Sequence, residues 1–258
     1  MLTQLDLDPE HCRAVEALDD SMAPRIPAAS VTLADFRRRE PRDGGIFVIG
    51  PERSPTLRQL TSVKKSWMAE AVNPMWPARR ISKDEILGEG LWRSMALPPG
   101  PMTPPARDPG PTVSVTQMQT EGLKPWPVPY RSPGDPLQFE PDRVAWFEVG
   151  FLHALQIEPL NAEVVIVTDS LMMPTLWPSA AVLINRRRTA PRDGMICGLW
   201  SGGTVVPRRL ISDETGWRVA ADAPAAPTRP LRLGESIVGE AVWTGAFLPG
   251  GAADRENE

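Results

Sequence analysis

The chain has little of the material from which metal sites and disulfides are built. Its 258 residues include two cysteines, Cys12 and Cys197, and two histidines, His11 and His153. Because zinc sites draw on cysteine and histidine, and these four residues share no metal-like spacing, we expect no metal and no cofactor. Two widely separated cysteines are typical of free thiols in a cytoplasmic protein, and that is the location we expect.

Long apolar runs and an excess of positive charge are also missing. No run of about 18 consecutive apolar residues occurs, so we expect no membrane span. The first six residues lack the basic and apolar regions of a signal peptide, so we expect none. The net charge of -4 argues against a broad nucleic-acid-binding surface, so direct nucleic-acid binding is not expected.

The chain does contain an internal repeat. The tetrapeptide Pro41–Gly44 recurs unchanged as Pro191–Gly194, 150 residues later. The same offset pairs further residues in order along the chain: Leu2 with Leu152, Asp19 with Asp169, Met22 with Met172, Pro24 with Pro174, Arg58 with Arg208, Leu60 with Leu210 and Pro74 with Pro224. Near the end the offset becomes 151, where Gly88-Glu89 and Trp92 match Gly239-Glu240 and Trp243. So many matches in one register predict two copies of one module.

The repeat predicts two domains, at residues 1–97 and 138–249. The first begins in register with residue 151, so we expect it to be shortened at its N-terminus. Many of the 30 prolines fall between the two copies, which predicts a semi-extended linker at residues 98–137 with a short strand at Thr112–Met118. The polar tail, residues 250–258, is predicted to fray.

Within a repeat the pattern predicts an all-β fold with a short helix. Short β-branched runs bounded by turn residues indicate strands at Val164–Thr168 and Ala181–Ile184, followed by a hairpin of Met195–Trp200 with Thr204–Leu210. Apolar residues at helical spacing predict one helix from Asp142 to Leu155.

The second repeat resembles the C-terminal domains of LexA and phage repressors, which are self-cleaving serine peptidases. The resemblance is carried by Val164–Leu176, Val182–Ile184, Asp193-Gly194, Val206–Leu210, Ala221–Pro224 and Gly239–Trp243. In the first repeat it runs through Asp20–Pro24, Asp43-Gly44, Thr56–Leu60, Val72–Pro74 and Gly88–Trp92. The resemblance implies two tandem β-clip domains of the LexA/signal-peptidase superfamily.

In that family a serine attacks a peptide bond of its own chain, and a neutral lysine accepts the serine proton. The resemblance places Ser21 at the serine position of the first repeat and Arg58 at the lysine position. In the second repeat these positions hold Leu171 and Arg208. Because arginine stays protonated in proteins and offers no acceptor, neither copy has a usable base, and the second also lacks the nucleophile. Both copies are therefore predicted to be catalytically degenerate.

Three other side chains are candidate replacements for the missing groups. Ser170 is one residue away from the expected nucleophile, but in extended chain this shift points it to the opposite face. Lys64 and Lys65 could replace Arg58 as the base, although their place in the next turn is typical of exposed lysines. No Ala-Gly bond, the usual cleavage site, occurs in Val128–Gly134.

Three functions follow. The first is a non-catalytic regulatory module that pairs through its β-faces, as the resemblance implies, either with itself or with a LexA- or phage-repressor-like protein, for example as an antirepressor or corepressor. The second is a Ser-Lys type autopeptidase that uses Ser21 with a displaced base. The third is a DNA-associated repressor without its own helix-turn-helix, for which Arg37–Arg39 and Arg186–Arg188 are the available basic clusters.

Overall fold

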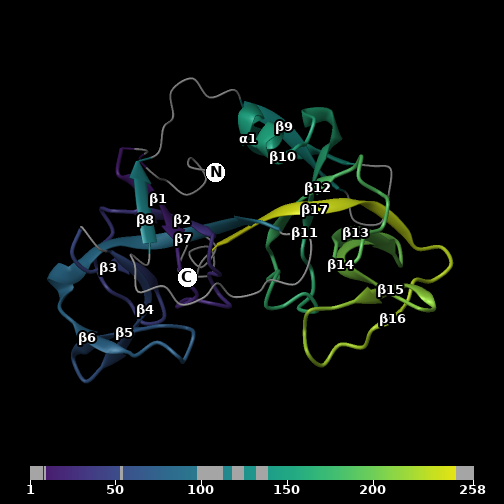
Figure 1. Ribbon diagram of the computed structural model, residues 1–258. Coiled ribbons are helices and arrows are strands. Elements are labelled where there is room, and N and C mark those ends of the chain that lie inside the picture. The colour runs from purple at the N-terminus through teal and green to yellow at the C-terminus, as the bar shows by residue number, and fades with distance from the viewer. Residues whose placement is uncertain are drawn as a thin grey trace. The chain divides into compact units, whose positions relative to one another are not determined.

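The computed structural model describes residues 8, 10–52, 55–97, 113–117, 125–131 and 139–247. The described residues form two compact units, each built on antiparallel strands (Figure 1). In the part of the chain that the structure describes, one short α-helix and two 3-10 turns accompany the strands. This confirms the predicted all-β class with a short helix. No helix in the described part of the chain is long and apolar enough to cross a membrane.

The described residues of the first unit contain eight strands. They are β1 (Cys12–Ala17), β2 (Val31–Asp35), β3 (Ile46–Ile49), β4 (Thr56–Val63), β5 (Ser66–Glu70), β6 (Arg79–Ile81), β7 (Ile86–Ala96) and β8 (Val113–Gln117), with a 3-10 turn, η2, at Lys83–Glu85. Strand β1 pairs with β2 and β8, and β7 pairs with both β2 and β3. From β3 onward the chain meanders through β4, β5 and β6.

The second unit begins with a hairpin and a helix. Strands β9 (Pro125–Arg131) and β10 (Phe139–Glu148) pair antiparallel, followed by α1 (Val149–Ala154) and the 3-10 turn η3 (Pro159–Asn161). Seven strands follow: β11 (Ala162–Ile166), β12 (Ala181–Asn185), β13 (Ile196–Ser201), β14 (Thr204–Asp213), β15 (Gly216–Ala220), β16 (Arg229–Pro230) and β17 (Ser236–Phe247). Strand β17 pairs with both β12 and β13, as β7 does with β2 and β3.

The two units share their strand order and their irregularities. The β2–β7 ladder shifts register between Leu33 and Ala34, and the β12–β17 ladder shifts between Leu183 and Ile184, 150 residues later. The turn after β1 and the turn after β11 each contain a cis peptide bond before proline, at Ala23-Pro24 and Met173-Pro174. The strands predicted in the second repeat are confirmed as β11 to β14.

Two sequence predictions need revision near the centre of the chain. The helix predicted from Asp142 to Leu155 is wrong over its first half, where β10 pairs with β9, and α1 starts only after Glu148, whose carboxylate accepts from the Phe151 N–H at 2.7 Å. The interval predicted as linker holds two strands: β8, which confirms the strand expected at Thr112–Met118, and β9, which was not expected.

Strand β9 tolerates three prolines because of where they fall. Pro125, Pro127 and Pro129 occupy alternate positions, and alternate residues of a strand direct their N–H groups to the same edge. The missing donors therefore all lie on one edge, and the other edge keeps its full set of donors. The shortened N-terminus predicted for the first repeat, residues 1–5, and the fraying tail, residues 250–258, lie outside the described residues.

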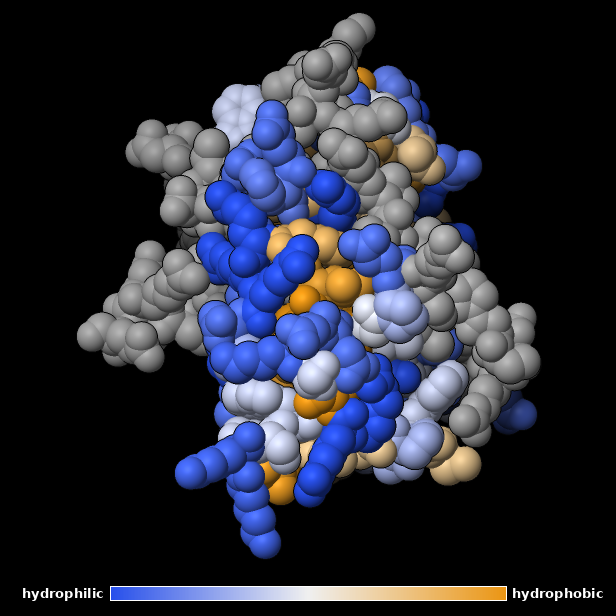
Figure 2. All heavy atoms as spheres, turned by 90° about the vertical axis from the view of Figure 1, so that its left-hand side faces the viewer, coloured by the Kyte–Doolittle hydropathy of each residue, from blue (hydrophilic) through white to orange (hydrophobic). Residues whose placement is uncertain are grey.

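Each unit has an apolar core of interdigitated side chains. In the first unit one cluster gathers Val15, Met22, Ile26, Ala34, Ile46, Val48 and Leu57, so the turn that carries Ser21 packs directly on the sheet. Trp67 covers a second cluster around Phe47 and Leu60, and Trp217 covers the matching cluster around Cys197 and Leu210. On the side of the first unit seen in Figure 2, hydrophilic side chains surround a narrow apolar strip.

The repeated tetrapeptide makes the same contacts in both units. The Asp43 carboxylate accepts from the Ser62 N–H, and the Asp193 carboxylate accepts from the Ser212 N–H, both at 2.8 Å. The glycine that follows each aspartate has a positive φ, 73° and 76°, which favours glycine over other residues.

The arginine of each tetrapeptide neutralises a buried carboxylate. Arg42 contacts Glu89 and Arg192 contacts Glu240, and both glutamates are buried. The arginines of the two basic clusters also contact carboxylates. In the first cluster, Arg37 and Arg38 bind Asp35, and Arg38 lies 3.9 Å from Glu89. In the second cluster, Arg186 binds Glu163 and Arg188 binds Glu240. Most of the candidate phosphate-binding arginines are thus engaged with acidic side chains of the protein itself.

Candidate functional site

The candidate site of the first unit lies in the turn between β1 and β2. Two residues after β1, Asp19 accepts a hydrogen bond from the Ser21 N–H at 2.9 Å through Oδ1. Ser21 is buried, and its carbonyl oxygen accepts from the Asn73 N–H at 3.0 Å. These contacts fix the Ser21 hydroxyl on the side of the turn that faces β4.

Arg58 approaches Ser21 from β4. Its Nη1 donates to Ser21 Oγ at 2.9 Å and to the Leu57 carbonyl oxygen at 2.6 Å. The two residues that the sequence assigned to the serine and lysine positions are therefore in direct contact. Since a guanidinium has no lone pair to accept a proton, this hydrogen bond runs in the direction opposite to the one that general-base catalysis requires.

Burial lowers the pKa of Arg58, an effect that the neighbouring charge of Asp19 opposes and that of Arg79 reinforces. An arginine nevertheless remains a cation at physiological pH. Among the described residues Arg58 forms no ion pair with a carboxylate, and Oδ2 of the buried Asp19 has no hydrogen-bond partner. The first unit thus holds a cation and a carboxylate close together without joining them.

The second unit arranges the equivalent residues differently. Leu171 replaces the serine and is exposed, and its N–H donates to Asp169 Oδ1 at 3.0 Å, as Ser21 does to Asp19. Arg208 has no hydroxyl to contact and instead binds Asp169 with both Nη atoms, at 3.4 Å and 2.5 Å. The arginine and the aspartate therefore form a two-point ion pair here.

The residues weighed as replacements lie away from Ser21 or are exposed. Ser170 is exposed in the bend after β11. Lys64 and Lys65 are exposed in the β4–β5 turn, both with positive φ. Lys64 is six residues beyond Arg58 along an extended strand, which separates their Cα atoms by about 20 Å, so neither lysine reaches Ser21.

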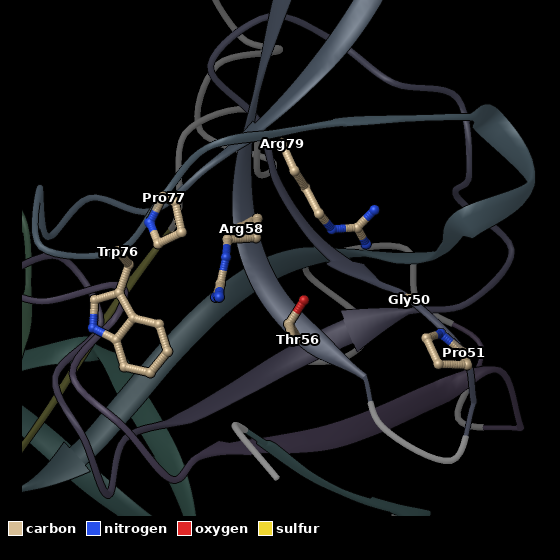
Figure 3. A pocket seen from close by; sticks show the side chains of 7 residues that line it. All are labelled: Gly50, Pro51, Thr56, Arg58, Trp76, Pro77 and Arg79. Carbon is tan, nitrogen blue, oxygen red and sulfur yellow. The ribbon is translucent and has the colours of Figure 1, made fainter. Parts of the chain in front are cut away.

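A hollow of about 320 Å³ opens beside Arg58 (Figure 3). Figure 3 shows Arg58 and Arg79 pointing into it, with the Trp76 indole on one side and the Thr56 hydroxyl below. Arg58 Cζ lies 5.8 Å from the centre of the Trp76 ring, a favourable cation–π distance. Trp76 is held by Asp20, whose carboxylate accepts from its Nε1 at 2.9 Å.

The second unit keeps Arg208, Pro227 and Arg229 at the positions of Arg58, Pro77 and Arg79, but it differs at other residues that line this hollow. At the equivalent positions Trp200 replaces Gly50, Val206 replaces Thr56 and Ala226 replaces Trp76. No repeat pattern pointed to the hollow, since Asp20, Asn73 and Trp76 have no counterpart at the 150-residue offset. Asp19 and Asp169 do recur at the 150-residue offset, and this was the available signal that an aspartate sits beside each arginine.

Comparison with known protein families supports the resemblance for the first unit. No curated protein matches the chain. Residues 1–90, which include Ser21 and Arg58, match the family model Peptidase S24-like, of the LexA/signal-peptidase superfamily.

Proposed function

We propose that the chain is a non-catalytic regulatory module of the LexA and phage-repressor type, which acts by pairing with a protein. The carrying observation is the 2.9 Å hydrogen bond from Arg58 Nη1 to Ser21 Oγ. The Arg58 guanidinium is permanently charged and donates to the Ser21 oxygen, so it cannot take the proton that Ser21 would have to lose in order to act as a nucleophile. The partner in this proposal is a second copy of the chain or a repressor with a LexA-like domain.

We also infer that the two units descend from one duplicated module. In support, the strand pairings, the register shifts, the tetrapeptide turns and the arginine–glutamate contacts recur at an offset of 150 or 151 residues. On this view one copy has lost the serine and both copies have lost the lysine, so the same site has diverged to different extents in the two units.

An active autopeptidase centred on Ser21 is the alternative, favoured by the family match over residues 1–90 and by the retained serine. Prolonged incubation of the full chain between pH 7 and pH 10, followed by intact mass measurement, separates the two. We expect one uncleaved full-length species for the wild type, as for Ser21→Ala. A fragment that forms in the wild type and not in Ser21→Ala would establish the peptidase.

Pairing is tested separately. Size-exclusion chromatography with light scattering is expected to give either a dimer of the chain or, after mixing with a LexA-like repressor, a complex with it. A strictly monomeric chain that leaves every such repressor unbound would refute the pairing proposal. A DNA-associated role has less support, because most of the basic clusters are engaged with the protein's own carboxylates.

A further inference from the structure

Two arginines in the described part of the chain are buried, and their surroundings differ. Arg209 binds both oxygens of Asp222 at 2.7 Å and also donates to the Gly194 carbonyl oxygen. Arg93, in β7, is only 4% exposed, and its Nη2 has no hydrogen-bond partner. Among the described residues no carboxylate pairs with Arg93, so its charge is buried without a counter-ion.

The register of the sheet places a second unpartnered group beside Arg93. Thr32 of β2 lies directly opposite Arg93 of β7, so their side chains share one face of the sheet. Thr32 is fully buried, and its Oγ1 has no hydrogen-bond partner. A buried cation and a buried hydroxyl thus lie next to each other, and neither is satisfied.

This arrangement is costly as it stands. Burial, with the nearby charge of Arg25 adding to it, lowers the pKa of Arg93 to about 10, so the group is still charged at neutral pH. Burying an ion without a partner is among the most unfavourable events in folding, and natural proteins pair such groups.

The second unit shows that the fold does not need a charge here. The equivalent cross-strand pair is Val182 with Thr244, and the Thr244 hydroxyl donates to the Ala181 carbonyl oxygen at 3.1 Å. The same position in the same ladder is therefore filled by neutral, satisfied side chains. The arginine is a feature of the first unit alone.

We propose that Arg93 and Thr32 form a buried binding site for a single carboxylate. The planar fork of a guanidinium matches the two oxygens of a carboxylate, and a hydroxyl can donate to one of them. One buried cation is neutralised by a monoanion, whereas a phosphate dianion would leave net charge in the core. The carboxylate comes from an acidic side chain or from a small organic acid, and the chain itself carries Asp254, Glu256 and Glu258 near its C-terminus.

The test compares the melting temperature of the full chain in sodium formate and in sodium chloride at equal ionic strength. The matched control is the double variant Thr32→Val with Arg93→Thr, which installs the residues of the second unit. Where the chain's own tail does not fill the site, we expect formate to raise the melting temperature of the wild type saturably and more than chloride. The double variant should respond equally to both salts. If the double variant does not fold, Thr32→Val alone serves as the second variant, because it keeps the charge of Arg93. It should move the midpoint of the formate-dependent rise in melting temperature to a higher formate concentration.

A further full-length variant, Asp254→Asn with Glu256→Gln and Glu258→Gln, identifies the source of the carboxylate. If the tail fills the site, the wild type responds equally to both salts and this variant responds selectively to formate. If a free acid or a partner fills it, both proteins respond selectively. The proposal is overturned if neither protein distinguishes formate from chloride, or if the double variant distinguishes them as the wild type does.

Discussion

The Arg58 guanidinium donates to the Ser21 hydroxyl, at the position where a LexA-type peptidase would place its proton-accepting lysine. This contact suggests that a single substitution separates the first unit from a working dyad. A lysine on β4 would lie in the same partly desolvated surroundings that lower the pKa of Arg58, and desolvation moves the pKa of a lysine towards neutrality.

Arg58→Lys should therefore make Ser21 reactive. We expect a fluorophosphonate probe to label the Arg58→Lys variant increasingly as the pH rises, and to leave the wild type unlabelled. Arg58→Lys combined with Ser21→Ala should abolish the label. The matched control is Arg208→Lys, which makes the same change beside Leu171 and should give no label. Labelling of the wild type at Ser21 would contradict the non-catalytic proposal.

The two equivalent aspartates should respond in opposite ways to loss of charge. Asp169→Asn breaks the two-point ion pair with Arg208 and should destabilise the second unit by about 1–3 kcal/mol. Asp19→Asn removes the charge from a buried carboxylate with an unpartnered oxygen and should cost the first unit much less, or stabilise it. Equal losses for both variants would show that Arg58 and Asp19 pair in solution as Arg208 and Asp169 do.

Each unit carries one cysteine that can report its own unfolding. Cys12 in β1 and Cys197 in β13 are both free and fully buried, and burial raises the pKa of both thiols, that of Cys197 to about 12. We expect neither thiol to react with Ellman's reagent at pH 8 in the native protein and both to react in denaturant. In Asp169→Asn, labelling of Cys197 should accelerate while that of Cys12 is unchanged, as mass spectrometry of the peptides would show.

Glu235 should make the second unit sensitive to acid. Two hydrogen bonds from Arg229 hold the pKa of Glu235 at about 2, and Ser201 and the Arg232 N–H also lower it. Because the pKa in the folded state lies below the ordinary value, this contribution is present above about pH 4.5 and is lost as the pH falls towards 2. In Glu235→Gln, the free energy of unfolding should be lower at pH 7 and depend less on pH between 4.5 and 2. A wild-type slope in the variant would remove Glu235 as the cause.

Sequence patterns predicted the strands and turns that depend on residues close together in the chain. Turn residues and β-branched runs identified β11 to β14, and the family resemblance placed Ser21 and Arg58 in one site. The failures have non-local causes. Residues 142–148 have helical spacing, but pairing with β9 draws them into a strand, although the prolines of β9 argued against a strand there.

The buried pair of Thr32 and Arg93 could not be foreseen at all. The two residues are 61 positions apart, and only the β2–β7 register brings them together. The recurrence of Asp19 and Asp169 indicated an aspartate near each arginine. It did not indicate the two-point form of the Arg208–Asp169 ion pair, which depends on whether a hydroxyl is present at position 171 to compete for the guanidinium.

The tetrapeptide turns have a consequence for how the chain could be rearranged. Each turn supplies both the backbone bend and an arginine that contacts a buried glutamate of β7 or β17. Either turn therefore meets the same need in either unit. Residues 38–44 and 188–194 carry these arginines in both units, so a chimera that exchanges them keeps Glu89 and Glu240 each matched to an arginine.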